Sequence, residues 1–348
     1  MTRIGRMGAV LVLAAFAFVP AAWADDGAFS TSQTARVYQT DWMSSLRDDT
    51  PLLDLSLPGT HDSATGNLGS FATEIVRTQS LPLDQQLDAG VRVLDIRCWA
   101  EHNGFTMHHG PISLGQTFGE VLRIVRTFLL HHPRETVLMR IMREGGGGGN
   151  TESFEQVFAR YADSDGRDLF WHPTGNTPTL GEVRGKVVVL QDFAASPPVG
   201  LSYSMFNTED HYWVNTNWDL YNKWKLVRDH LAYALEEKGK AYFMTFLSAA
   251  GGSFPYFVAG GRIWASDKAP HLSTGLVTPL FKSRYPDFPR AGCLGPICSI
   301  MFAGTNELVV DKILSAHPPP FVGIVMADFP GPDLIGRIIA ANAEYEAH

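Results

Sequence analysis

The chain has 348 residues, of which 45% are hydrophobic and 18% are charged. This composition is typical of a folded globular protein and argues against a disordered or low-complexity chain. The net charge of −8 excludes a general attraction to nucleic acid or to anionic membranes, so we expect no nucleic-acid partner and expect any lipid contact to come from apolar side chains.

The N-terminus has the pattern of an export signal. Arg3 and Arg6 precede an apolar run, which ends in the small-x-small pattern Ala22-Trp23-Ala24. The run is shorter than the roughly 20 residues that span a bilayer. We therefore predict a signal peptide at 1–24, a mature domain at 25–348, and a secreted protein, either extracellular or periplasmic.

Three cysteines are present. Cys293 and Cys298 enclose a short loop that can close as a disulfide after export, with two reduced thiols as the alternative. Cys98 is then left over, and we expect it to be buried. Three scattered cysteines do not make a zinc site.

The hydrophobic pattern predicts strands that alternate with helices. Apolar helical spacing covers 114–129 and 221–237, and a last helix begins near Asp333. We expect Pro58-Gly59 to stop the first strand and the five glycines at 145–149 to form a mobile loop. The strand-like runs are 52–57, 90–99, 105–109, 135–142, 186–190, 241–247 and 321–327.

Near-continuous apolar strands separated by helices favour a parallel sheet that is covered on its outer face. Their number favours a closed sheet, so we predict an α/β protein with a single, distorted TIM-type (β/α) barrel. Functional residues of such barrels lie at the carboxyl ends of the strands. The polar groups at the predicted strand ends are His61-Asp62, Asp95 with Arg97, His108-His109, and Asp328.

Neighbouring strands bring some of these groups together. The first and last strands of a closed barrel are adjacent, so we expect Asp328 close to His61. Asp95 and Arg97 are two residues apart on one strand and share a face.

These residue types suit one kind of chemistry. One histidine can take a proton from a hydroxyl while a second gives one to a leaving oxygen. A carboxylate beside each histidine fixes its tautomer, and Arg97 can bind two phosphate oxygens at once. The set describes phosphodiester cleavage by an internal hydroxyl. A metal site is the competing interpretation, but the fixed charge of Arg97 would repel a divalent cation, so we expect neither metal nor cofactor.

Three segments resemble the bacterial phosphatidylinositol-specific phospholipase C family, and the resemblance extends over roughly residues 50–345. They are Leu57-Pro58-Gly59-Thr60-His61-Asp62-Ser63, Arg92-Val93-Leu94-Asp95-Ile96-Arg97 and His108-His109-Gly110-Pro111. The order and spacing of the three together are more specific than any one segment alone.

The resemblance implies a role for each residue. His61 would be the general base on the inositol 2-hydroxyl, with Asp328 as its partner. His109 would be the general acid for the diacylglycerol oxygen, and Asp62 would help on that side. Arg97 would bind the phosphate where calcium sits in metal-dependent relatives. Asp95 would support both His109 and Arg97.

Headgroup binding departs from the family's pattern. Asp219 and Tyr221 match its inositol-contacting pair, with Tyr221 expected to stack on the ring or, alternatively, to be a core residue at the start of a helix. The family's inositol-binding lysine falls at Met142 and its arginine near Asp192. Arg140 and Arg143 are the candidate replacements for the lysine.

The expected function is therefore a metal-independent phosphatidylinositol diacylglycerol-lyase that forms a 1,2-cyclic inositol phosphate and diacylglycerol. Its partner would be an inositol phospholipid, and we expect a monomer with transient membrane contact. Aromatic residues at 212–213, 218 and 254–257 are candidates for that contact. Two alternatives remain: a metal-dependent glycerophosphodiester phosphodiesterase, and a barrel that binds inositol lipid with little turnover.

Overall fold

The structure is a computed structural model that describes residues 27–68, 74–164 and 168–347. The predicted signal peptide lies outside these ranges. Within them, no helix is both long enough and apolar enough to span a bilayer.

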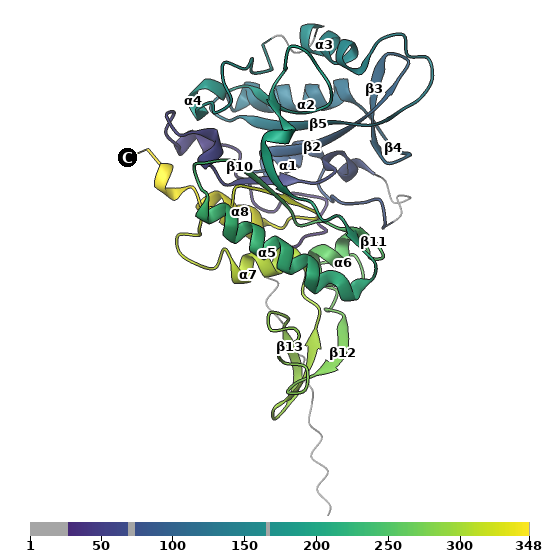
Figure 1. Cartoon of the computed structure of the whole chain (residues 1–348), viewed down its shortest axis with the longest axis vertical. Coiled ribbons are helices and arrows are strands. Elements are labelled where there is room, and N and C mark those ends of the chain that lie inside the picture. The colour runs from purple at the N-terminus through teal and green to yellow at the C-terminus, as the bar shows by residue number, and fades with distance from the viewer. Residues whose placement is uncertain (1–26, 69–73, 165–167, 348) are drawn as a thin grey trace, which may run out of the picture.

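A nearly closed parallel barrel forms the centre of the molecule, which confirms the predicted fold class (Figure 1). Hydrogen-bonded pairing runs in the order β7-β6-β5-β2-β1-β15-β10-β8. The two ends of this path, β7 and β8, are joined by a short 3-10 turn at Tyr203–Met205. The barrel strands are β1 Leu57–Thr60, β2 Val93–Glu101, β5 Val137–Gly146, β6 Val187–Asp192, β7 Leu201–Ser202, β8 Phe206–Glu209, β10 Tyr242–Phe246 and β15 Ile324–Ala327.

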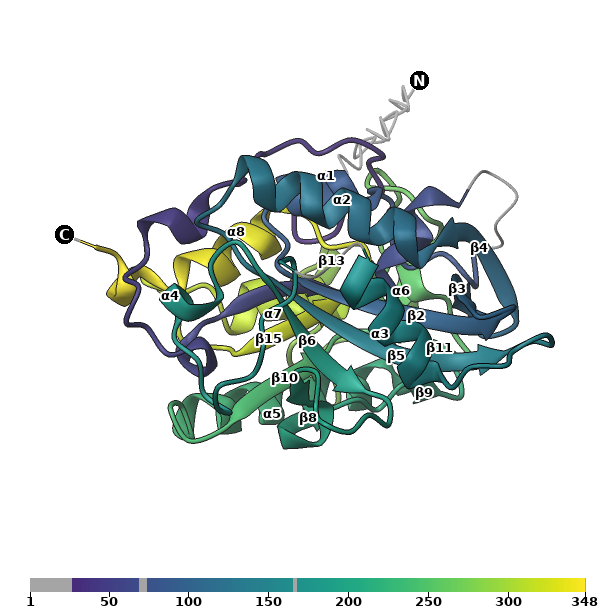
Figure 2. The ribbon, with the colours of Figure 1, turned by 90° about the horizontal axis from the view of Figure 1, so that it is seen from above.

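Helices cover the outside of the barrel. Figure 2 shows α1 and α2 along one side of the sheet and α5 along the opposite side. The helix α2 begins at a capping box formed by Thr117 and Glu120, and its buried residues recur every three or four positions. The helices are α1 Leu83–Asp88, α2 Phe118–His131, α3 Phe154–Ser164, α4 Leu180–Val183, α5 Leu220–Glu236, α6 Pro255–Gly260, α7 Thr305–Lys312 and α8 Pro332–Ala340.

The interior of the barrel is filled by alternate residues of the strands. Its apolar part includes Leu57, Val93, Leu138, Val188, Met244 and Ile324, which pack together. Because side chains alternate across a strand, the next inward positions along β2, β5 and β6 are Asp95, Arg140 and Leu190. The interior thus changes from apolar to charged toward the carboxyl ends of the strands.

The first strand differs from the prediction. Residues Leu52–Asp54 form a 3-10 turn, and Pro58 and Gly59 lie inside β1 instead of ending it. A Cβ atom on Gly59 would lie 2.4 Å from the sulfur of Met326 and 3.0 Å from the Cβ of Val93, so a larger residue would displace these side chains. The glycine run also differs, because β5 continues to Gly146 before the chain turns.

Three additions to the barrel were not predicted as such. The hairpin β3 Gly104–His109 and β4 Ile112–Thr117 extends β2, so α2 begins at Phe118 and not at residue 114. A separate antiparallel sheet, with strand order β12-β14-β13, projects from the barrel between α6 and α7 (Figure 1). Its strands are β12 Ser273–Val277, β13 Arg290–Leu294 and β14 Ile297–Met301, and a small pair is formed by β9 Trp213–Val214 and β11 Ala250–Gly251.

A fully buried ion pair supports the barrel at the end opposite the predicted site. Arg92 contacts Glu135 at 2.7 Å and also donates hydrogen bonds to backbone carbonyls such as Leu87 O. We expect Arg92→Ala to lower the free energy of unfolding by about 3–5 kcal/mol, because it leaves Glu135 buried without its partner. Urea denaturation measures this, with exposed Arg123→Ala as the control. A loss below about 1 kcal/mol would contradict the importance of the pair.

Candidate active site

The carboxyl ends of β1, β2 and β15 hold the centre of the site. β1 pairs with β15, so His61 and Asp328, which follow these two strands directly, lie side by side as expected from their adjacency. On β2, the same-face residues Asp95 and Arg97 reach the same end of the barrel. Residues far apart in the sequence are thus brought into one cluster.

His61 is held from both sides of its ring. Its Nδ1 lies 2.8 Å from Asp328 Oδ1, and its Nε2 lies 2.8 Å from a guanidinium nitrogen of Arg97. Nδ1 therefore carries a hydrogen that it donates to Asp328, and Nε2 accepts from Arg97. Burial favours the neutral ring, but the Asp328 carboxylate outweighs burial and raises the pKa of His61 above its usual 6.5.

Arg97 is the positive centre of the cluster. Its Nε lies 3.0 Å from Asp62 Oδ1 and 3.2 Å from Asp95 Oδ2. Burial opposes the charge on Arg97, but these carboxylates hold its pKa above the usual range. The guanidinium is therefore charged at every working pH, and its terminal nitrogens face His61 on one side and Glu144, at 3.7 Å, on the other.

Asp62 connects the two histidines. Its Oδ2 lies 3.8 Å from His61 Nε2 and 3.5 Å from His109 Nε2. The other ring nitrogen of His109, Nδ1, donates to the backbone carbonyl of Val76 at 2.9 Å, so its Nε2 is directed at the carboxylate. Burial raises the pKa of Asp62, which favours sharing a proton with His109.

The expected support of His109 by Asp95 is wrong. Asp95 is buried and accepts from Arg97, from Arg140 and from the backbone N–H of Asp62. Burial alone would raise the pKa of Asp95, but the two guanidinium groups lower it well below the usual range. Its role is to hold Arg97, and the carboxylate beside His109 is that of Asp62.

Glu144 is a residue of the site that the sequence did not single out. It follows Arg140 and Met142 on the inward face of β5. Its Oε1 accepts from the backbone N–H of Gly110, 2.7 Å away, which fixes the turn after His109. The period of two along β5 was the signal that could have identified it.

Arg140 and Arg143 lie on opposite faces of β5 and have different surroundings. The side chain of Arg140 is only 7% exposed and pairs with Asp192 at 2.7 Å and Asp95 at 3.2 Å. Its guanidinium lies over the ring of Tyr203. Arg140 therefore supports Asp95 and is not free for a headgroup. Arg143 is exposed and belongs to the opposite, outer face of β5, so its expected contact with a headgroup is wrong.

Asp219 and Tyr221 also lie outside the cluster. Asp219 Oδ2 accepts from the backbone N–H of Asn215, where it helps to cap the turn before α5. Tyr221 is buried within α5 and donates its hydroxyl to Asp287 at 3.0 Å. Its ring packs edge-on against Phe288. The expected stacking of Tyr221 on a sugar is wrong, and the alternative of a core tyrosine at the start of a helix is confirmed.

Two further charged residues lie near this end of the barrel. Glu209, at the end of β8, contacts Lys223 Nζ of α5 at 2.8 Å. Lys223 is fully buried, and burial lowers its pKa despite the carboxylates of Glu209 and Asp328. No sequence signal separated this pair from an ordinary helix lysine.

Two buried carboxylate oxygens of the cluster accept no hydrogen bond from the described part of the chain. They are Asp62 Oδ2 and Asp328 Oδ2. A buried acceptor without a donor is unfavourable, so both suit a ligand that brings hydroxyl groups. Within residues 27–68, 74–164 and 168–347, no three His, Cys, Asp or Glu side chains are arranged to hold a metal ion.

The contact between His61 and Asp328 predicts a pH effect. A general base must be neutral, so activity should rise as the pH rises through the elevated pKa of His61. Asp328→Asn removes the charge that raises this pKa. We expect the acidic limb of the pH profile of kcat/KM to move to lower pH while the maximal rate falls. An unchanged limb would show that Asp328 does not act on the base.

The structure is a (β/α) barrel whose carboxyl end holds a cluster of two histidines, carboxylates and one arginine. Residues 55–192 match the model of the phosphatidylinositol-specific phospholipase C X domain. This segment, which contains the three motifs, is therefore similar to that X domain.

Individual proteins show the same similarity. The chain is 31% identical over 172 residues to the 1-phosphatidylinositol phosphodiesterase of Listeria monocytogenes, a segment that covers 48% of this chain and 53% of that protein. The Staphylococcus aureus protein of the same name is 31% identical over 154 residues, with 43% and 49% covered. The chain thus spans about half the length of the curated relatives that it matches.

Solved structures cover more of the chain. The phosphatidylinositol-specific phospholipase C of Listeria monocytogenes superimposes with a TM-score of 0.63 at 25% identity, covering 88% of this chain and 99% of that one. A Staphylococcus aureus phosphatidylinositol-specific phospholipase C gives 0.66 at 21% identity, with 90% and 99% covered. The second comparison supports the barrel fold alone.

Proposed function

We propose that the protein is a phosphatidylinositol-specific phospholipase C that cleaves its lipid in two proton transfers. The observation that carries this proposal is that the Nε2 atoms of His61 and His109 both lie within 4 Å of the same oxygen of Asp62. Arg97 lies in the same cluster. A base and an acid are thus directed at one small volume beside a fixed positive charge.

The first step is attack by the inositol 2-hydroxyl. His61 Nε2 takes the hydroxyl proton, and Asp328 stabilises the imidazolium that forms. The oxygen bonds to phosphorus, and Arg97 binds the phosphate oxygens as negative charge develops on them. In this step Arg97 gives up its contact with His61 and contacts the phosphate oxygens instead.

The second transfer releases the diacylglycerol oxygen. His109, protonated on Nε2 and paired with Asp62, gives its proton to that oxygen as the bond to phosphorus breaks. The products are a 1,2-cyclic inositol phosphate and diacylglycerol. Water can then open the cyclic phosphate if the two histidines exchange roles.

Incubation with phosphatidylinositol vesicles tests this function. We expect ³¹P NMR to show a five-membered cyclic phosphodiester as the first product. A glycerophosphodiester phosphodiesterase would yield a phosphomonoester without this intermediate. Binding of the vesicles without any product would instead favour a barrel that binds inositol lipid with little turnover.

Lipid contact at the mouth of the barrel is part of the proposal. Tyr212, Trp213 and Phe254 are exposed, and they lie on adjacent segments because β9 pairs with β11. Aromatic side chains of this kind suit the membrane interface. Tyr256 and Phe257, which were also candidates, are buried in the core and take no part.

We also propose export and action as a monomer. Cys293 and Cys298 form a disulfide, a bond that persists in oxidising compartments. Cys98 is free and buried, as expected. N-terminal sequencing of protein from the culture fluid or periplasm, with Asp25 as the expected first residue, tests the export. Static light scattering tests the monomer.

A further inference from the structure

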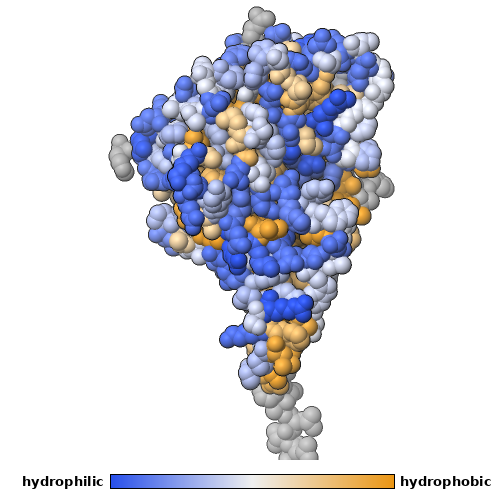
Figure 3. All heavy atoms as spheres, in the orientation of Figure 1, coloured by the Kyte–Doolittle hydropathy of each residue, from blue (hydrophilic) through white to orange (hydrophobic). Residues whose placement is uncertain are grey.

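The sheet β12–β14 projects away from the barrel and ends in an apolar turn. Figure 3 shows hydrophobic atoms gathered at the end of this projection. Leu294 is 81% exposed, Leu280 is 78% exposed and Ile297 is 51% exposed. The two leucines are the most exposed large hydrophobic side chains of the described residues. We call Leu280, Leu294 and Ile297 the apolar tip.

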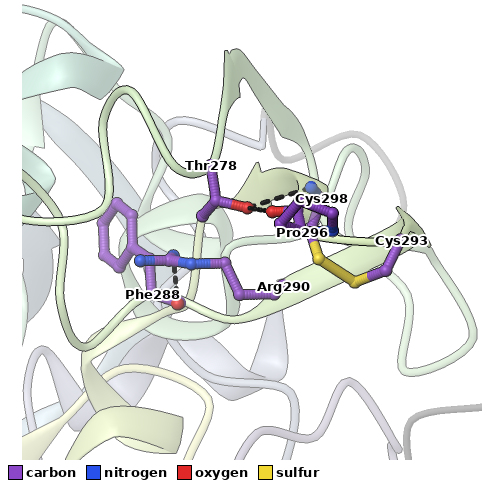
Figure 4. The surroundings of a disulfide bond; sticks show 6 residues. All are labelled: Thr278, Phe288, Arg290, Cys293, Pro296 and Cys298. Carbon is purple, nitrogen blue, oxygen red and sulfur yellow. Dashed lines mark hydrogen bonds between the residues drawn. A yellow bond between two sulfur atoms is a disulfide. The ribbon is translucent and has the colours of Figure 1, made fainter.

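The apolar tip is a rigid structure. The disulfide between Cys293 and Cys298 closes the turn that carries Leu294 and Ile297 (Figure 4). Thr278 fixes the same turn, because its Oγ1 donates to Pro296 O and accepts from the backbone N–H of Cys298, each at 2.9 Å. The exposed side chains are therefore held in place before any partner arrives, which lowers the entropy lost on binding.

The base of the projection is well packed. Tyr285, Phe288, Ile300 and Phe302 belong to the hydrophobic core under α5 to α7. The large exposed hydrophobic residues lie at the far end of the sheet. The projection thus carries its apolar residues outward on a fixed base.

The charge of this sheet is opposite to that of the whole protein. Residues 273–301 contain Lys282, Arg284 and Arg290 but a single acid, Asp287, in a chain of net charge −8. Asp287 is directed inward, since its Oδ2 accepts from Tyr221 and from Trp224 Nε1.

One exposed cation, Lys282, lies close to the apolar tip, and Arg284 lies over the ring of Tyr285. Lys282 and Pro296 line the same surface hollow. Among the described residues, neither Lys282 nor Arg284 has a carboxylate within 4 Å. Exposed aliphatic side chains beside a cation that has no carboxylate partner match the chemistry of an anionic lipid surface.

We propose that the apolar tip is a second membrane anchor, which inserts Leu280, Leu294 and Ile297 into a bilayer containing anionic phospholipid. Lys282 then contacts the headgroup phosphates, and Arg284 adds positive charge to the same projection. A dimer interface is disfavoured because three side chains on a convex tip fall far short of the roughly 20–30 residues a side of a stable interface. No residue of the tip belongs to the active site, so anchoring is separate from catalysis.

Binding to sedimented vesicles tests the proposal with the full mature chain. The vesicles contain phosphatidylcholine with or without phosphatidylglycerol and no phosphatidylinositol, so the outcome does not depend on turnover. We expect Leu280→Ser/Leu294→Ser/Ile297→Ser to reduce partitioning onto the anionic vesicles at least about tenfold. Leu130→Ser is the matched control, because Leu130 is 73% exposed on α2, and it should bind like the parent.

A charge variant tests the second half of the proposal and does not depend on the apolar replacements. Lys282→Glu/Arg284→Glu should weaken binding to the anionic vesicles and leave binding to pure phosphatidylcholine unchanged. Parental binding by the triple variant, or an equal loss in Leu130→Ser, would overturn the proposal. A parent that is a dimer in solution and becomes monomeric in the triple variant would overturn it too, in favour of a second copy of the chain.

Discussion

Replacement of His61 by alanine is expected to reduce turnover of phosphatidylinositol by at least about 100-fold, the lower end of the range for a general acid or base. The ring is the acceptor closest to Arg97, and Asp328 fixes its tautomer. Without His61, no other described side chain places an unprotonated nitrogen beside the guanidinium of Arg97, so nothing replaces the base. Initial rates on mixed micelles of phosphatidylinositol and detergent measure the effect.

His109→Ala should reduce turnover of the lipid by a similar factor. A substrate with a good leaving group separates the two roles. With an inositol p-nitrophenyl phosphodiester, departure needs no proton, so His109→Ala should lose much less activity than it loses on the lipid. His61→Ala should lose the same on both substrates. If either variant kept a tenth of the activity on the lipid, that histidine would have no place in the mechanism.

Arg97→Lys is expected to reduce kcat by about 100-fold or more, the scale of losing a donor that stabilises transition-state charge. An ammonium group cannot make two parallel bonds to a phosphate. It also cannot contact Asp62, Asp95 and His61 with the geometry of the guanidinium. Because the phosphate gains charge in the transition state, kcat should fall more than KM rises.

Arg143→Lys is the matched control for this change. Arg143 lies near the end of the neighbouring strand β5 but on its outer face, so its replacement should leave both kinetic constants unchanged. Equal effects of the two substitutions, or an effect of Arg97→Lys on KM alone, would contradict the assignment of the phosphate to Arg97.

Much of the barrel and the centre of the site could be predicted because two simple rules govern them. Strand residues alternate, so Asp95 and Arg97 had to share a face. A closed parallel barrel makes its first and last strands neighbours, so Asp328 could be placed beside His61 across more than 260 residues. The same alternation explains why His109 reaches the cluster while His108 stacks on Trp99.

The rest depended on contacts that no period encodes. Tyr221 fits a headgroup motif, yet the core between α5 and the projecting sheet takes its ring and Asp287 takes its hydroxyl. Arg140 sits at the expected end of β5, but Asp192 on β6 neutralises it, and only the pairing of the two strands reveals this. The sheet β12–β14 was missed because its strands are short and half exposed.

Arg97 is proposed to supply, between the rings of His61 and His109, the positive charge that a bound metal ion would otherwise supply. The most direct test is the rate of phosphatidylinositol cleavage by the purified protein before and after exhaustive treatment with a chelator of divalent metals. The structure predicts the same rate in both cases, because Arg97 supplies the positive charge at the phosphate. A rate abolished by the chelator and restored by calcium would contradict the claim.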